Sequence, residues 1–357
     1  MSDGEREVER RTLEIKTLSP ILIGSGEKAR IGYDYIRQDG RAIRVDIEKL
    51  TMLLDEKGIE DLVGSMRKPD EFSIEKFVNE KKIEPKDIAA YYLENHAKQD
   101  FERTYEVHVF IKDGLGRPYI PGSSIKGSIK GCLVYDKVKI PTPDKMQELI
   151  RNRELRDHLR GIVVEIEKSL RERRFGLRDV YSDAPSDAML ALCPLEIHRE
   201  RDGALGEMMR SRRGRGSKLF GEFIPPNLSF KTEMWVKNFG DTEELNVTRI
   251  LGICSERCRR IVEAEIRFFG DYGAFSAEYE RVVDFYKKLK EEKMYLLRLG
   301  MGSSFFMTSV FSEDERLRRE LLPRRRSRNA ESCPNSRKLC RYNGSLFPPG
   351  WVAVEVK

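Results

Sequence analysis

The order of strand-like and helical segments is the feature that most constrains how this chain can fold. Strand-like segments span residues 12–18, 33–37, 42–45, 105–111, 189–198, 228–236, 295–299 and 351–356. Helical patterns span residues 50–65, 74–97, 124–134, 144–174, 247–268 and 276–292. A strand pattern, a glycine-rich turn, helices and returning strands therefore occur twice along the chain. This repetition predicts an α+β fold built from two similar halves.

Two ferredoxin-like domains are the architecture that such an order favours. A chain of 357 residues is long enough for two domains that each bury a core. We expect an N-terminal domain over residues 1–185 and a C-terminal domain over residues 186–357. The charged helical stretches within residues 50–100 indicate an insertion in the first domain, and residues 300–304 supply a glycine-rich loop to the second.

One segment near the middle of the chain carries the most specific chemistry, because a Gly-Ser-Ser turn stands where a short apolar run becomes a basic helix. Gly122 permits unusual backbone angles, and Ser123 and Ser124 would present amides and hydroxyls at a helix N-terminus, which stabilises an anion. Lys126 and Lys130 share one helix face. Two lysines beside such a turn suit a phosphodiester chain, and the sequence has no Walker-type loop for a mononucleotide. A serine-capped helix with solvated lysines is the alternative, and the segment alone does not decide between the two.

Charge is distributed in blocks rather than as a large excess. Lys and Arg total 66 against 60 Asp and Glu, a net charge of +6, but arginines gather at residues 171–174, 210–215 and 324–326. Local basic patches of this kind favour a polyanionic partner. Residues 210–217 hold four arginines and two glycines without a large apolar side chain, so we expect them to become ordered against RNA or an acidic neighbour.

Hydropathy and cysteine usage indicate the cellular compartment of the protein. No apolar run approaches the roughly 18 residues needed to cross a bilayer, and the charged start is unlike a signal peptide. We therefore expect a cytoplasmic protein without a membrane partner. The six scattered cysteines are expected to be reduced. Cys254 with Cys258 and Cys333 with Cys340 could in principle bind zinc, but neither pair has the usual ligand spacing, so buried or idle thiols are favoured.

Three motifs together resemble the RAMP superfamily of CRISPR ribonucleoprotein subunits. They are LSPILIGSG at residues 18–26, IPGSSIKG at residues 120–127 and LGMGS at residues 299–303. Two further motifs, GYDYI at residues 32–36 and FPPGW at residues 347–351, resemble the subunit of type III-A Csm complexes that caps the 3′-end side of the guide RNA. The motifs are spread over nearly the whole chain.

The resemblance implies a non-catalytic RNA-binding subunit without a cofactor or metal. Its implied role is to bind the 3′ region of the guide RNA (crRNA), to cap the backbone filament and to support guide maturation. The implied partners are the guide RNA, other Csm-complex subunits, especially the repeated backbone subunit, and host nucleases that trim the guide. The implied RNA-contacting residues are Gly24, Ser25, Gly26, Gly122, Ser123, Ser124, Lys126, Lys130, Gly300, Gly302 and Ser303. Contacts to phosphates and 2′-hydroxyls suit a guide of any sequence.

A nuclease is the alternative, because related subunits include a guide-processing endoribonuclease and backbone subunits that cut target RNA. The first kind commonly uses a histidine with a tyrosine or lysine as acid and base. The four histidines, His96, His108, His158 and His198, lie outside the glycine-rich turns. Asp34 follows Gly24-Ser25-Gly26 much as the catalytic aspartate does in backbone subunits, but its neighbours Tyr33 and Tyr35 match the capping subunits, so we interpret it as structural. A free single-stranded RNA binder that stacks bases on Tyr33 and Tyr35 is a third possibility.

Overall fold

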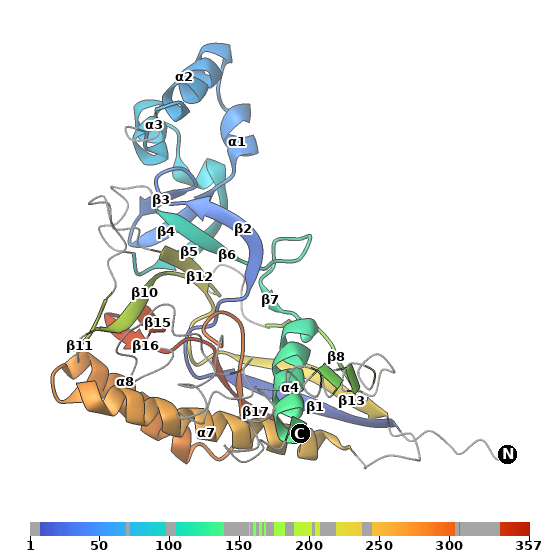
Figure 1. Cartoon of the computed structure of the whole chain (residues 1–357). Coiled ribbons are helices and arrows are strands. Elements are labelled where there is room, and N and C mark those ends of the chain that lie inside the picture. Colours follow the sequence, from blue (N-terminus) through green and yellow to red (C-terminus); the bar gives the residue numbers. More distant parts are fainter. Residues whose placement is uncertain are drawn as a thin grey trace.

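The computed structural model describes most of the chain. The described residues are 8–68, 72–97, 105–138, 175–182, 189–201, 204–207, 219–237, 245–303, 307 and 336–357, with the isolated positions 157, 160, 161, 164, 165 and 168. They form two large sheets, a two-stranded ribbon and helices (Figure 1). The predicted α+β class is confirmed.

The smaller of the two sheets has five antiparallel strands. Their order is β14 (Tyr295–Arg298), β17 (Trp351–Val356), β1 (Val8–Thr17), β13 (Ser229–Lys237) and β8 (Phe175–Leu177). In β1, the buried residues Leu13, Ile15 and Thr17 alternate with exposed or half-buried ones, because successive strand side chains point to opposite faces. One face of β1 therefore packs on the core.

The larger sheet is mixed and has ten strands. Its main path is β2 (Gly24–Arg30), β6 (Glu106–Phe110), β12 (Leu219–Phe223), β10 (Ala191–Arg201), β5 (Ala89–Asn95), β4 (Arg41–Val45) and β3 (Tyr35–Gln38). Strand β10 also pairs with β11 (Ala204–Glu207) and β15 (Ser336–Tyr342), and β15 pairs with β16 (Ser345–Phe347). The ribbon consists of β7 (Tyr119–Ile120) and β9 (Val180–Tyr181).

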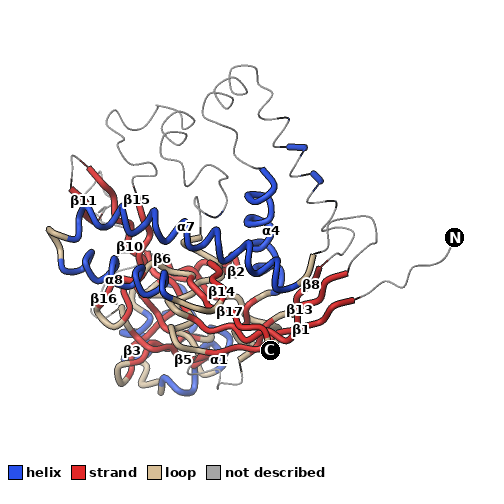
Figure 2. The backbone as a smooth tube through the Cα atoms, turned by 90° about the horizontal axis from the view of Figure 1, so that it is seen from below, coloured by secondary structure: helices blue, strands red, loops and turns tan. Residues whose placement is uncertain are grey.

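The helices fall into two groups. The first is α1 (Ile47–Met52), α2 (Glu56–Met66), α3 (Ile74–Glu80) and the 3-10 turn Pro85–Ile88, and the second is α4 (Gly122–Val138), α7 (Val247–Gly273) and α8 (Ala277–Glu291). Asp46, Asp55, Ser73 and Asn246 begin α1, α2, α3 and α7 by accepting hydrogen bonds from first-turn amides. Figures 1 and 2 show α7 and α8 side by side along the body, with α4 against α7.

The first group of helices belongs to an insertion with a core of its own. Ile36, Ile43, Leu50, Leu62 and Phe77 are buried together there, apart from the main core. Figure 1 shows α1, α2 and α3 projecting from the rest of the chain beyond β3 and β4. A helix over residues 50–65 was expected, but the structure divides it at Asp55, whose side chain starts a new helix.

The prediction of a helix over residues 74–97 is wrong for the second half of that range. Helix α3 ends at Glu80, and residues 89–95 form β5, which pairs with β4 and β10. Pro85 breaks the helix, and the pair Tyr91-Tyr92 suits a strand surface better than a helix. The helix expected over residues 144–174 lies almost entirely outside the described residues.

Each sheet contains strands from both of the predicted domains. In the smaller sheet, β1 lies between β13 and β17, and in the larger sheet β6 lies beside β12. The sheets therefore do not mark a boundary near residue 185, and the division into residues 1–185 and 186–357 stays a prediction.

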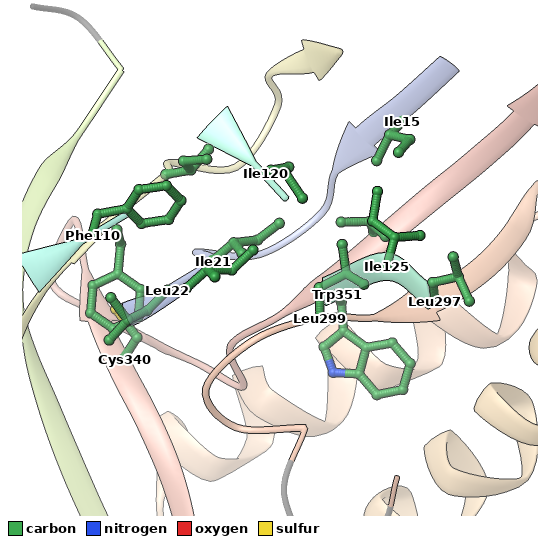
Figure 3. Packing of buried hydrophobic residues seen from close by; sticks show 14 of the residues in the cluster. Ile15, Ile21, Leu22, Phe110, Ile120, Ile125, Leu297, Leu299, Cys340 and Trp351 are labelled. Carbon is green, nitrogen blue, oxygen red and sulfur yellow. The ribbon is translucent and has the colours of Figure 1, made fainter. Parts of the chain in front are cut away.

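A short crossing segment after β1 ties the two sheets together. Ile21 and Leu22 are fully buried, and Ile21 bridges to Ile224 between β12 and β13. Figure 3 shows Leu22 near Phe110 and Cys340 of the larger sheet, whereas Trp351 of the smaller sheet lies on the other side of the crossing. The apolar run of residues 21–23 is thus core between sheets rather than a strand.

Candidate RNA-binding site

Parts of three motifs meet at one place: the motif at residues 18–26, the motif at residues 299–303 and the motif at residues 347–351. We call this place the glycine junction (residues 19–23, 299–303 and 349–351). The amide of Met301 donates to the carbonyl of Leu22 at 2.7 Å, and the amide of Gly350 donates to the carbonyl of Pro20 at 2.9 Å. The amide of Leu299 donates to the carbonyl of Gly350 at 2.7 Å. Three segments distant in sequence are therefore joined through their backbones.

Glycines are required at the junction because the backbones approach so closely. Gly300 has a φ of +66°, and a Cβ on it would lie 2.3 Å from the carbonyl oxygen of Leu22. Gly302 has a φ of +104°, and its Cβ would lie 2.6 Å from Cγ of Pro349. The Ser303 hydroxyl donates to the Gly300 carbonyl at 2.6 Å and closes the turn. These glycines thus have a packing role, and their contact with RNA stays a prediction.

The turn at the start of α4 already holds a carboxylate. The amide of Gly122 donates to Oδ1 of Asp179 at 2.8 Å, and a Cβ on Gly122 would lie 2.5 Å from the carbonyl oxygen of Leu177. The amide of Ser124 donates to the carbonyl of Pro121 at 2.9 Å, whereas the Ser123 side chain is exposed. Asp179 uses the stabilisation that a helix N-terminus offers an anion. Any phosphate at this turn would have to be held by side chains more than by the Gly122 amide.

The two lysines of α4 lie half-buried on the helix, four residues apart. Lys126 Nζ lies 6.0 Å from the ring centre of Phe175 in β8. Between them, the Ser128 hydroxyl donates to the carbonyl of Arg298 at 2.9 Å and ties α4 to β14. The Arg298 side chain in turn donates to the carbonyl of Pro349 at 3.3 Å. The helix that carries the lysines is therefore anchored to the glycine junction.

Gly24, Ser25 and Gly26 are exposed at the start of β2, an edge strand of the larger sheet. The strand has an irregular register between Gly24 and Lys28, and Gly26 has a φ of +90°. The Ser25 hydroxyl donates to the carbonyl of Val109 at 3.3 Å and accepts from the amide of Glu27 at 3.1 Å. This irregular edge leaves the backbone accessible, so a contact with RNA there stays open to test.

The contacts of Asp34 with nearby residues give its carboxylate a structural role. Its Oδ2 accepts from the amide of Arg30 at 2.7 Å, and its Oδ1 lies 3.5 Å from Nη2 of Arg44, which also pairs with Glu27 at 2.9 Å. The carboxylate closes the turn between β2 and β3, which supports the structural interpretation of this residue.

The described histidines do not form an open acid–base pair like that of a ribonuclease. His198 is 3% exposed, with Nδ1 2.8 Å from the Tyr279 hydroxyl and Nε2 2.9 Å from Oε2 of Glu196. A histidine beside a tyrosine is the pair that an acid–base ribonuclease would use, but this one is shut away from a substrate. Burial lowers the pKa of His108, and His96 lies 3.0 Å from Glu94. His158 lies outside the described residues.

The five cysteines that the structure describes form two separate buried groups. Hydrogen bonds with Cys254 and Cys258 lower the pKa of Cys132, and these contacts join α4 to α7. Burial raises the pKa of Cys193, and the hydrogen bond between Cys193 and Cys340 acts in the same direction. Cys254 and Cys258 thus have Cys132 as their partner rather than Cys340, and Cys333 lies outside the described residues. Among the residues that the structure describes, no group of three or more His, Cys, Asp or Glu is placed to hold a metal ion.

The sequence did not point to an aromatic group beside the start of α4. The rings of Tyr119 and Tyr181 are stacked, with centroids 5.4 Å apart and planes 17° from parallel. The guanidinium of Arg117 lies 5.1 Å from the centre of the Tyr181 ring. We call Arg117, Tyr119 and Tyr181 the Tyr181 stack. The pairing of β7 with β9 brings these residues together from distant parts of the sequence, so no local pattern could have revealed the group.

No described helix has both the length and the apolar character that a membrane crossing requires. The helices are instead amphipathic, such as α7, or short.

Comparisons with known proteins agree with the motifs. The model of the RAMP superfamily matches residues 14–304. The chain is 28% identical over 133 residues to the CRISPR system Cms protein Csm5 of Streptococcus thermophilus, a match that covers 34% of this chain and 37% of that protein. It is 28% identical over 145 residues to the protein of the same name from Enterococcus italicus, covering 34% of this chain and 42% of that protein. The matched part thus spans about two fifths of each relative.

Two solved structures share the fold over nearly the whole length. One is a chain from the cryo-EM structure of a Csm-crRNA-target RNA ternary complex of a type III-A CRISPR-Cas system, with a TM-score of 0.66, 19% identity, and coverage of 97% of this chain and 100% of that one. The other is the crystal structure of T. onnurineus Csm5, with a TM-score of 0.65, 20% identity, and coverage of 96% and 100%. At these identities the likeness establishes the fold. The family model matches well over half of this chain, and the chain therefore belongs to the RAMP superfamily.

Proposed function

We propose that this chain is a non-catalytic RNA-binding subunit of a type III-A CRISPR ribonucleoprotein. In this role it binds the 3′ region of the guide RNA, caps the filament of backbone subunits and supports guide maturation. The observation that carries the proposal is that the sequence relatives and one solved structure of the same fold bear the same name, Csm5. A chain of the same fold comes from a Csm-crRNA-target RNA complex.

The surface around α4 supports RNA binding. Ser123 is exposed, Ser124, Lys126 and Lys130 are half-buried, and all four follow a turn in which the Gly122 amide donates to Asp179. Lysines and hydroxyls bind phosphates and 2′-hydroxyls without regard to base sequence, which a subunit that accepts any guide requires. The rigid anchoring of α4 to the glycine junction fixes the position of these groups before RNA arrives.

The non-catalytic part of the proposal is supported by the partners of the candidate nuclease residues. Asp34 is held by the Arg30 amide and lies near Arg44, and His198 is enclosed between Tyr279 and Glu196. A general acid or base must come within hydrogen-bond reach of its substrate, and these contacts occupy the groups that would do so.

The proposed partners are the guide RNA, the repeated backbone subunit and other Csm-complex subunits, with host nucleases trimming the guide in the cytoplasm. Co-purification of an affinity-tagged copy from cells that express the complete CRISPR locus tests the proposal. We expect RAMP backbone subunits and a short RNA of nearly uniform length in the eluate. Recovery of the protein alone, or with those subunits but without RNA, would overturn the proposal.

A further inference from the structure

The Tyr181 stack is an unusual feature for a protein surface. Tyr181 is 41% exposed and the Arg117 side chain is 57% exposed, although both take part in ring contacts. Elsewhere, stacked rings such as Phe269 and Tyr286 are fully buried and serve the core. A stack that contributes only to stability would be expected to exclude water in the same way.

Arg117 is held in place by a short turn. Its amide and its Nε donate to the two carboxylate oxygens of Asp113 at 2.9 Å each, and its Nη2 lies 2.8 Å from Oδ2. A carboxylate binds a guanidinium in the plane of the guanidinium. One face of the guanidinium lies toward the Tyr181 ring, so the opposite face remains available for stacking, and Asp113 fixes its orientation.

The stack lies next to the proposed phosphate contacts. Figure 1 shows β7, which ends at Ile120, leading directly into α4. Tyr119 is separated from Ser123 by four peptide steps, which span at most about 15 Å. Asp179, which accepts from the first amide of α4, comes immediately before the opposite strand β9 and is two residues from Tyr181. A base on the stack and a phosphate at Ser123 or Lys126 would thus be within reach of one RNA strand.

Exposed aromatic rings with an adjacent arginine are the means by which proteins hold unpaired bases of single-stranded RNA. We propose that the Tyr181 stack binds a base of the RNA strand whose backbone is held at α4. This inference rests on the proposed function and deepens it, because it adds base stacking to backbone contacts. Stacking tolerates any base, so it is compatible with guides of any sequence.

Binding of the full-length protein to two fluorescent oligomers tests the inference, one of uridines and one of abasic nucleotides of equal length. Tyr181→Ala should weaken binding of oligouridine by about 5- to 150-fold. Binding of the abasic oligomer should be unchanged. Tyr181→Phe, which keeps the ring, should bind oligouridine like the wild type. Phe275→Ala removes an 85% exposed aromatic side chain from the turn between α7 and α8 and is the matched control that should have no effect.

The outcomes separate this inference from the proposed function. If Tyr181→Ala binds both oligomers like the wild type while Lys126→Ala/Lys130→Ala weakens both, the stack is not a base site but the RNA-binding function stands. If Tyr181→Ala keeps normal RNA binding and instead loses its association with backbone subunits, the stack is a protein contact and the inference is wrong. If the wild type binds neither oligomer at low salt, the proposed function fails together with the inference.

Discussion

Replacing Glu222 with alanine removes the carboxylate at the centre of a buried polar network. Glu222 is 0% exposed, and it accepts from the hydroxyls of Tyr35 and Tyr91 at 2.8 and 2.6 Å. It also accepts from the amide of Phe110 at 3.0 Å and from Nζ of Lys112 at 2.6 Å. The two tyrosines lie in β3 and β5, which precede and follow helices α1 to α3 along the chain, so this carboxylate joins the base of the insertion to β12 in the larger sheet.

The expected loss of stability follows from these contacts. Breaking a buried ion pair by removal of one partner costs about 3–5 kcal/mol, because the other charge stays buried. The two hydroxyls and the amide also lose their acceptor, at about 1–3 kcal/mol for each donor that stays dry. We therefore expect Glu222→Ala to lower the free energy of unfolding by at least about 5 kcal/mol. Glu222→Gln, which keeps one acceptor oxygen, should lose less.

Urea unfolding followed by circular dichroism measures the effect as a shift of the midpoint. The matched control is Glu27→Ala, because the Glu27 side chain is 54% exposed and its partner Arg44, 2.9 Å away, keeps Asp34 as a second partner at 3.5 Å. An exposed pair contributes at most about 1 kcal/mol. If Glu222→Ala shifts the midpoint no further than Glu27→Ala does, the network does not hold the insertion and the reasoning is refuted.

Three further predictions concern the site, the junction and the pH dependence. Lys126→Ala/Lys130→Ala should lower the salt slope of single-stranded RNA binding by about 1.4 log units, as measured by fluorescence anisotropy, and an unchanged slope would make these lysines mere surface charges. Gly300→Ala should lower the free energy of unfolding, measured in urea, by more than about 2 kcal/mol. The loss should exceed that of Gly40→Ala, because Gly40 also has a positive φ, of +78°, but open space at its Cβ position; equal losses would refute the close-approach argument. Burial alone would raise the pKa of Glu196, but hydrogen bonds from a histidine and an arginine outweigh it and lower the pKa to about 2. Its stabilising contribution, up to about 3 kcal/mol, is present above pH 4.5 and lost as the pH falls toward 2, so Glu196→Gln should show a shallower loss of stability below pH 4.5 than the wild type.

Local patterns in the sequence predicted many elements because their causes are local. The strands β1, β6, β13 and β17 follow alternating or apolar runs, and α7 and α8 follow a periodic apolar face. The strand β5 was missed because the helical pattern that begins in α3 was extended past Pro85, and pairing with β4 and β10 makes residues 89–95 a strand. Strands β12, β15 and β16 were also missed, because pairing with neighbouring strands, which no local pattern shows, makes them strands.

In the candidate site, too, the features with local causes could be predicted and those that depend on distant segments could not. The sequence pointed to Lys126 and Lys130 because a helix places residues four apart on one face. It could not show that Asp179 occupies the Gly122 amide or that Tyr181 stacks on Tyr119, because these contacts depend on the pairing of β7 with β9. The motif glycines could be recognised in the sequence. The reason that glycine is needed there could not, because it lies in the close approach of three segments that are distant in sequence.

Site-specific crosslinking of the guide RNA in the assembled complex tests most directly where this chain lies. Guides with a single 4-thiouridine near the 3′ end or near the 5′ end are irradiated, and the crosslinked subunit and peptide are identified by mass spectrometry. We predict that 3′-proximal positions crosslink to this chain, with adducts on the peptides that hold Arg117 to Lys130, and that 5′-proximal positions do not. Crosslinks to this chain from 5′ positions alone, or 3′ positions that crosslink only to other subunits, would contradict the proposed function.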